Sequence, residues 1–106
     1  MFRRCVFWME VNRMIELRVE LKGYVAVLYK DTNGKPILNN IDAYSYEGTK
    51  LWNIKEALDS ALGTEKDEWY PDMGAVDGHL SVYAFRGIRY LLDGETGKLL
   101  EKRVVK

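Results

Sequence analysis

Residues 14–22 read Met-Ile-Glu-Leu-Arg-Val-Glu-Leu-Lys. Apolar and charged side chains alternate along this stretch, so the apolar side chains share one face of an extended chain. A period of two with one charged face is typical of an antiparallel strand that covers a core on one side. The stretch therefore predicts a half-buried β-strand. The residues expected toward the core are Ile15, Leu17, Val19 and Leu21.

Further strand signals follow on both sides of a hairpin turn. Residues 24–29 are β-branched or aromatic, and they predict a strand that is apolar on both faces. Gly23, just before them, is either a tight turn or a bulge inside one long strand. Asn33 and Gly34 suit the two turn positions that need positive φ. Residues 37–46 then predict a weaker returning strand.

A short helix is predicted after residue 53. Asn53 can cap the first backbone amides, and Glu56, three residues later, can complete a capping box. Thr49 is a competing cap one turn earlier, and Gly63 is placed to end the helix. The apolar residues of this segment fall on one helical face: Leu51, Ile54, Leu58, Ala61 and Leu62.

The remaining chain predicts an acidic, aromatic loop at 64–78 and a three-stranded meander over 80–105. The element order is then β-β-β-α-β-β-β. This order predicts an α+β domain with a mainly antiparallel sheet of five or six strands and one principal helix packed on one face. We expect a single domain at 14–106, with residues 1–13 as an N-terminal extension or an extra strand.

The composition excludes several classes of protein. The 106 residues carry 16 basic and 16 acidic side chains, and a net charge of zero argues against nucleic-acid binding through bulk electrostatics. A single cysteine, Cys5, rules out an intramolecular disulfide and a cysteine-rich zinc module. The apolar stretch at 5–9 is too short for a signal peptide or a membrane span. We therefore expect a cytoplasmic protein that does not enter the membrane.

One short helix cannot cover a sheet of five or six strands. A helix of about 10 residues is roughly 15 Å long and 10 Å across, so it covers two or three strands spaced about 4.8 Å apart. The other, tyrosine-rich face needs a cover: the 64–78 loop, the N-terminal segment, closure into a partial barrel, a second subunit or a ligand. We favour self-association, or another protein partner, through this aromatic sheet face. The expected binding residues are Tyr44, Tyr46, Trp69, Tyr70, Tyr83 and Tyr90.

No set of side chains in the sequence predicts catalysis or a cofactor. His79 is the single histidine, and no serine or cysteine nucleophile is adjacent to it in the sequence. A nucleophile, a base and an orienting group do not occur together. We therefore expect a non-enzymatic protein without cofactors.

The acidic loop favours an alternative function. Residues 64–78 carry one basic and five acidic side chains, and a hard cation such as Ca²⁺ takes about six to eight oxygen ligands. The loop is then a cation or small-ligand site, a solvated segment, or a segment that docks on the basic C-terminal strands. The candidate metal ligands are Asp67, Glu68, Asp72 and Asp77.

A second alternative is a binder of single-stranded nucleic acid. Residues 86–90, Arg-Gly-Ile-Arg-Tyr, come close to an RNA-recognition signature, but Ile88 replaces its first stacking aromatic residue. Bases would stack on Tyr83 and Tyr90, with Arg89 on phosphates. We do not favour this alternative.

The C-terminal half resembles the tail of PepSY domains, which are small extracytoplasmic modules linked to peptidase inhibition. The resemblance rests on a helix followed by three strands that end in residues 90–100, Tyr-Leu-Leu-Asp-Gly-Glu-Thr-Gly-Lys-Leu-Leu. It covers about half of the chain, and no functional residue is carried over from it.

Overall fold

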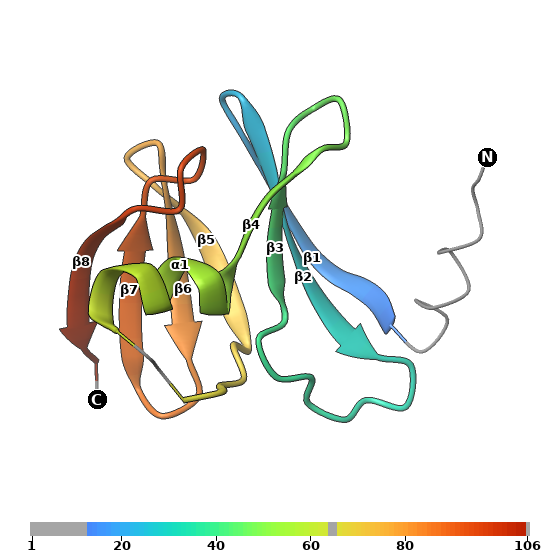
Figure 1. Cartoon of the computed structure of the whole chain (residues 1–106). Coiled ribbons are helices and arrows are strands. Elements are labelled where there is room, and N and C mark those ends of the chain that lie inside the picture. The colour runs from blue at the N-terminus through green and yellow to red at the C-terminus, as the bar shows by residue number, and fades with distance from the viewer. Residues whose placement is uncertain (1–12, 64–65, 106) are drawn as a thin grey trace.

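The computed structural model describes residues 13–63 and 66–105, which form two four-stranded antiparallel sheets and a helix (Figure 1). The N-terminal sheet contains β1 (Arg13–Leu21), β2 (Tyr24–Asp31), β3 (Ile41–Tyr44) and β4 (Lys50–Asn53). The helix α1 (Ile54–Leu62) follows. The C-terminal sheet contains β5 (Asp72–Val76), β6 (His79–Ala84), β7 (Ile88–Leu92) and β8 (Leu99–Val104). In both sheets the strands lie side by side in chain order.

The prediction of a mainly antiparallel α+β fold is confirmed, but the prediction of one sheet with five or six strands is wrong. Two short strands are missing from that prediction. β4 has four residues and runs directly into the helix, and β5 lies inside the segment interpreted as a loop. The returning strand expected at 37–46 is limited to the four residues of β3. The expected N-terminal extension or extra strand lies outside the described residues, apart from Arg13, which begins β1.

β1 and β2 form the hairpin that the alternating stretch predicts. Gly23, with a φ of 88°, lies in the turn between them, so it is a turn residue and not a bulge. The strand has its bulge between Ile15 and Leu17. A bulge reverses the facing of the residues before it, and Ile15, expected in the core, is 54% exposed.

The helix begins at the predicted cap. The Asn53 side chain accepts the N–H of Lys55 at 2.9 Å, and the Glu56 carboxylate accepts the N–H of Asn53 at 3.1 Å. Gly63, with a φ of 86°, ends the helix. The capping box is confirmed, and Thr49 is not the cap.

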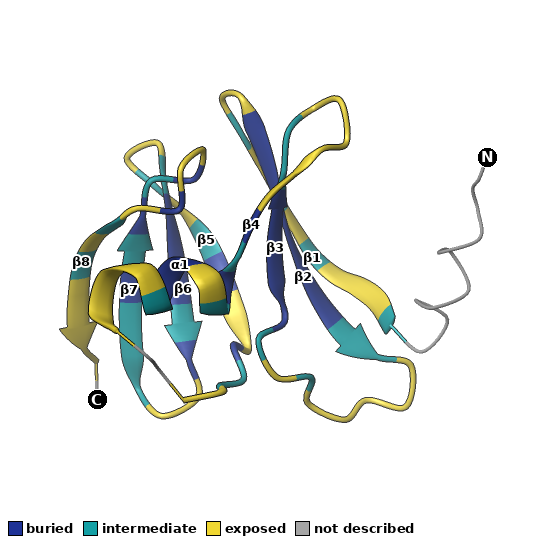
Figure 2. Ribbon diagram, in the orientation of Figure 1, coloured by how far each residue is buried: buried dark blue, intermediate teal, exposed yellow. Residues whose placement is uncertain are grey.

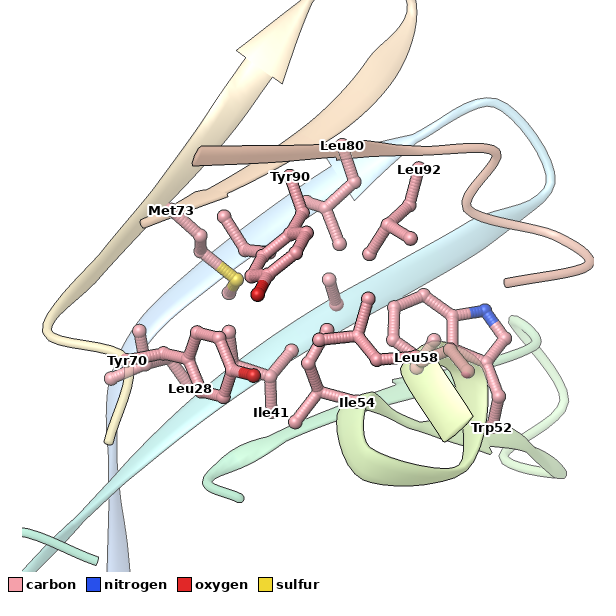
Figure 3. Packing of buried hydrophobic residues seen from close by; sticks show 14 of the residues in the cluster. Leu28, Ile41, Trp52, Ile54, Leu58, Tyr70, Met73, Leu80, Tyr90 and Leu92 are labelled. Atoms are coloured by element: carbon pink, nitrogen blue, oxygen red, sulfur yellow. The ribbon is translucent and has the colours of Figure 1, made fainter. Parts of the chain in front are cut away.

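The main apolar core lies between the two sheets, with the helix packed beside it (Figure 3). Leu28 and Ile41 of the N-terminal sheet face Leu80 and Tyr90 of the C-terminal sheet, and Leu58 of the helix joins them. Figure 2 shows the buried positions as a band that runs through β2, β3 and β6. Each sheet therefore covers the inner face of the other.

This closure corrects the premise that one helix must cover a wide aromatic sheet. Tyr24 and Tyr70 are each 2% exposed, and Tyr90 is fully buried. These three rings lie in one interior with the helix. The inner faces of the two sheets are therefore closed to a partner.

Candidate interaction surface on the C-terminal sheet

The C-terminal sheet has one face in the core and one face outside it. Its core residues include Met73, Leu80, Val82, Tyr90 and Leu92. Side chains alternate along a strand, so the residues between these point to the opposite side. No residue on that side belongs to an apolar cluster within the described part of the chain. We call it the outer face, and it consists of Asp72, Gly74, Val76, His79, Ser81, Tyr83, Arg89, Leu91, Glu101 and Arg103.

Four of these residues form one row across the sheet, which we call the charged row. Asp72 pairs with Tyr83, Tyr83 pairs with Arg89, and Arg89 pairs with Arg103. Neighbouring strands are about 4.8 Å apart, so the row measures about 14 Å from end to end. It carries an acid at the β5 edge, then a tyrosine, then two arginines toward the β8 edge.

Glu101 neutralises only part of the positive end of the charged row. Its carboxylate is 3.5 Å from Nη2 of Arg89 and 2.8 Å from Nη2 of Arg103. The Arg103 side chain is nonetheless 60% exposed. Asp72, at the other edge, has no ion-pair partner among the described residues, and its carboxylate accepts the N–H of Met73 at 2.9 Å. The row is therefore negative at one edge and positive at the other.

Two polar atoms on this side of the sheet lack hydrogen-bond partners. Ser81 Oγ and Arg89 Nε are buried and make no hydrogen bond within residues 13–63 and 66–105. Ser81 pairs with Gly74 and Leu91 on the neighbouring strands. The polar groups of the outer face are therefore not fully satisfied by the residues that the structure describes.

An aromatic pair extends the outer face beyond the charged row. The ring centroids of Trp69 and Phe85 are 5.0 Å apart, and the Phe85 N–H donates to the Trp69 carbonyl at 3.0 Å. Phe85 is the first residue of the turn that follows β6, two positions after Tyr83 of the charged row. It is 68% exposed, which is a large apolar surface for a solvent-facing position.

The six predicted binding residues do not share one surface. Trp69 and Tyr83 lie on or beside the outer face, as described above. Tyr70 and Tyr90 are in the core, where no partner reaches their rings, so we leave both out of the proposal. Phe85 and Arg103 are not among the predicted binding residues, although the sequence alternates Phe85 with Leu80, Val82 and Ala84.

The remaining two tyrosines belong to the N-terminal half. The Tyr44 hydroxyl is 3.0 Å from the hydroxyl of Tyr29, and Tyr44 packs against a small apolar cluster on β2. The Tyr46 hydroxyl donates to the carbonyl of Leu21, and its ring is exposed. Neither residue adjoins the charged row.

The structure does not bring the four candidate metal ligands together. Asp67 accepts from Asn39 at 3.1 Å, and Glu68 forms an ion pair of 2.7 Å with Arg86. Asp72 and Asp77 lie on β5 and in the turn after it. No group of three or more His, Cys, Asp or Glu side chains is placed to hold a metal ion in the described parts of the chain. The presence of β5 spreads these carboxylates apart, and Glu68 docks on the turn between β6 and β7.

A family model described as "Domain of unknown function (DUF7957)" matches residues 8–104. No curated protein and no solved structure matches the chain. The matching family is not the PepSY family that the C-terminal half resembles. The helix that the structure describes is neither long nor apolar enough to cross a membrane.

Proposed function

We propose that this chain, which belongs to the DUF7957 family, a domain of unknown function, is an interaction module. In this proposal two copies of the chain pair through the outer face. The observation that carries this proposal is the order of charge in the charged row, from Asp72 to Arg103. Such a row is complementary to a reversed copy of itself.

A two-fold axis parallel to the strands reverses the row. Asp72 then faces Arg103 of the second copy, and Tyr83 faces Arg89 of the second copy. The first contact pairs opposite charges, and the second places a guanidinium on an aromatic ring, which is also attractive. Glu101 falls opposite Gly74, which has no side chain to oppose it. The Asp72–Arg103 contact and the Tyr83–Arg89 contact each occur twice, as in any isologous interface.

The other in-plane two-fold axis, parallel to the row, is disfavoured. It places Asp72 opposite Asp72 and Arg103 opposite Arg103, and like charges in contact weaken association. Charge therefore selects one geometry of pairing, with the strands of the two sheets nearly aligned as in a β-sandwich.

The size of the outer face predicts a weak dimer. Four strands of about five residues span roughly 19 Å by 17 Å, which is smaller than the ~800 Å² that each partner buries in a standard interface. Phe85 and Trp69 enlarge the contact at one end and supply apolar area. We therefore expect a dimer that dissociates on dilution.

We assign no catalysis to this surface. The outer face carries two hydroxyl side chains, Tyr83 and Ser81. The Oγ of Ser81 has no hydrogen-bond partner among the described residues. A serine nucleophile needs a base within hydrogen-bond reach. The charges and rings of the outer face suit recognition.

Sedimentation velocity over a range of protein concentrations tests this function. We expect the wild-type chain to shift from monomer toward dimer as concentration rises, and Asp72→Arg to weaken the dimer about tenfold or more because it creates two repulsive contacts. Glu47→Arg, an exposed charge reversal in the turn between β3 and β4, is the matched control and should leave the dimer unchanged. A monomer at every concentration, or equal effects of the two variants, would contradict the proposal.

A further inference from the structure

A second feature of the surface lies at the end of the molecule where three hairpin turns meet. The β1–β2, β5–β6 and β7–β8 turns come together at the top of Figure 1. They line a partly open cavity of about 490 Å³, which is within the usual range for small-ligand sites. Its walls are formed by Lys22, Gly23, Tyr24, Gly78, His79, Asp93, Gly94 and Glu95.

The buried side chain in this wall is Tyr24. Its ring lies directly against the backbone of Gly94: a Cβ atom there would come within 1.5 Å of the ring Cζ and 1.8 Å of the hydroxyl oxygen. Tyr24 is 2% exposed, and its hydroxyl has no hydrogen-bond partner within the described residues. A buried hydroxyl without a hydrogen-bond partner lowers the stability of the fold. A ligand group that forms a hydrogen bond with this hydroxyl would therefore be favoured.

Two carboxylates line the same cavity, on the turn whose Gly94 packs against the Tyr24 ring. Asp93 Oδ1 accepts the N–H of Glu95 at 3.1 Å, which fixes the turn that carries both acids. The Glu95 side chain lies over Gly23, whose added Cβ would come within 2.9 Å of Glu95 Oε2. Neither acid forms an ion pair among the described residues, and Lys22, which also lines the cavity, pairs with neither of them.

The chemical state of Tyr24 agrees with this arrangement. Burial of the hydroxyl, and then the negative charges of Asp93 and Glu95, raise the pKa of Tyr24 to about 12. The phenol is therefore neutral at physiological pH, and its oxygen is free to accept a hydrogen bond.

We propose that this cavity binds a primary ammonium group. An ammonium carries three N–H donors, and three side chains that can accept them line the cavity: Asp93, Glu95 and Tyr24, whose buried hydroxyl lacks a partner among the described residues. Hydrogen bonds from an ammonium to a carboxylate are charge-assisted and stronger than neutral ones. The ligand is a small free amine or a lysine side chain, which present the same group. His79 belongs to both this cavity wall and the outer face, but it is neither one of the three acceptors nor part of the charged row, so the site stands or fails independently of the proposed dimer.

Titration with n-butylammonium chloride, followed by the backbone amide NMR signals of Gly23, Gly94 and Glu95, tests the site. Sodium butyrate is the matched anionic probe, and Nα-acetyl-lysine amide presents the same ammonium as a lysine side chain. We expect saturable shifts with both ammonium probes and none with butyrate. Tighter binding of the lysine probe would indicate a peptide ligand, and equal binding would indicate a free amine; either result supports the site.

Three variants make this test specific. Asp93→Asn and Glu95→Gln together should abolish saturation, and Asp93→Asn keeps the oxygen that accepts the Glu95 N–H. Tyr24→Phe removes one acceptor and should weaken binding about fivefold, as expected for one hydrogen bond. Glu16→Gln, at an exposed position of β1 away from its turn, is the control and should bind as the wild type does. Absence of saturation with both ammonium probes, equal shifts with butyrate, or shifts that persist in the double variant would overturn the proposal.

Discussion

The side chain of Asn40 pairs with the backbone of Tyr70 as one strand pairs with another. Asn40 Nδ2 donates to the Tyr70 carbonyl at 2.9 Å, and the Tyr70 N–H donates to Asn40 Oδ1 at 3.0 Å. Asn40 Nδ2 also reaches the carbonyl of Tyr29 at 3.2 Å. One buried amide thus joins the end of β2 to the segment that enters β5, and it ties the two halves of the chain together.

Replacement of this amide should destabilise the whole fold. Asn40→Ala removes three buried hydrogen bonds to the backbone of Tyr70 and Tyr29, at a cost of about 3 kcal/mol in the free energy of unfolding. Urea denaturation followed by tryptophan fluorescence measures the change. Thr32→Ala, an exposed turn substitution, should change the free energy by less than about 0.5 kcal/mol. An Asn40→Ala protein as stable as the wild type would show that the two halves do not depend on this contact.

Gly94 should be irreplaceable for a steric reason alone. An added methyl group collides with the ring of Tyr24, so Gly94→Ala should lower the free energy of unfolding by about 2–3 kcal/mol. Gly74 offers a matched control, because nothing lies within 4 Å of an added Cβ there. Gly74→Ala should be neutral or slightly stabilising in the same thermal or urea unfolding experiment at low protein concentration. Equal tolerance of the two substitutions would show that Tyr24 does not lie against Gly94.

Stability should fall at alkaline pH through Tyr24. Its pKa is about 12 in the folded chain and near the ordinary value of about 10 in the unfolded chain. The folded state therefore holds the proton more tightly, and the stabilisation is present below pH 10 and is lost as the pH rises from about 10 to 12. Urea midpoints measured across this range should fall less in Tyr24→Phe than in the wild type. Parallel falls in the two proteins would assign the alkaline loss to other groups.

The elements that the sequence predicts well are those whose signals are local. The strand alternation from Leu17 to Leu21 and the capping box of Asn53 and Glu56 each depend on residues within a few positions of one another, whereas the sequence left Gly23 open between a turn and a bulge. β4 and β5 are not predicted because strands of four or five residues contain too few apolar-polar alternations to recognise. In β5, Gly74 and the preceding Pro71 also have a low strand propensity, which favours a loop.

The candidate surface could be predicted only in part, because strand register decides it. The sequence identifies Tyr83 as a surface aromatic residue, but it treats Tyr70 and Tyr90 in the same way, and both are buried. Asp72 and Arg103 are 31 positions apart in the chain, and only the pairing of four strands puts them in one row. A shift of one residue in any strand moves a side chain to the other face.

The pairing of Asp72 with Arg103 across two copies is tested most directly by mixing two charge-reversed proteins. Asp72→Arg alone places arginines against arginines, and Arg103→Asp alone places carboxylates against carboxylates, so each protein should be monomeric in sedimentation velocity. Mixed in equal amounts, they should form a dimer with one chain of each kind, because both contacts then pair opposite charges. A mixture that stays monomeric while the wild type dimerises, or single variants that dimerise as the wild type does, would contradict pairing through this row.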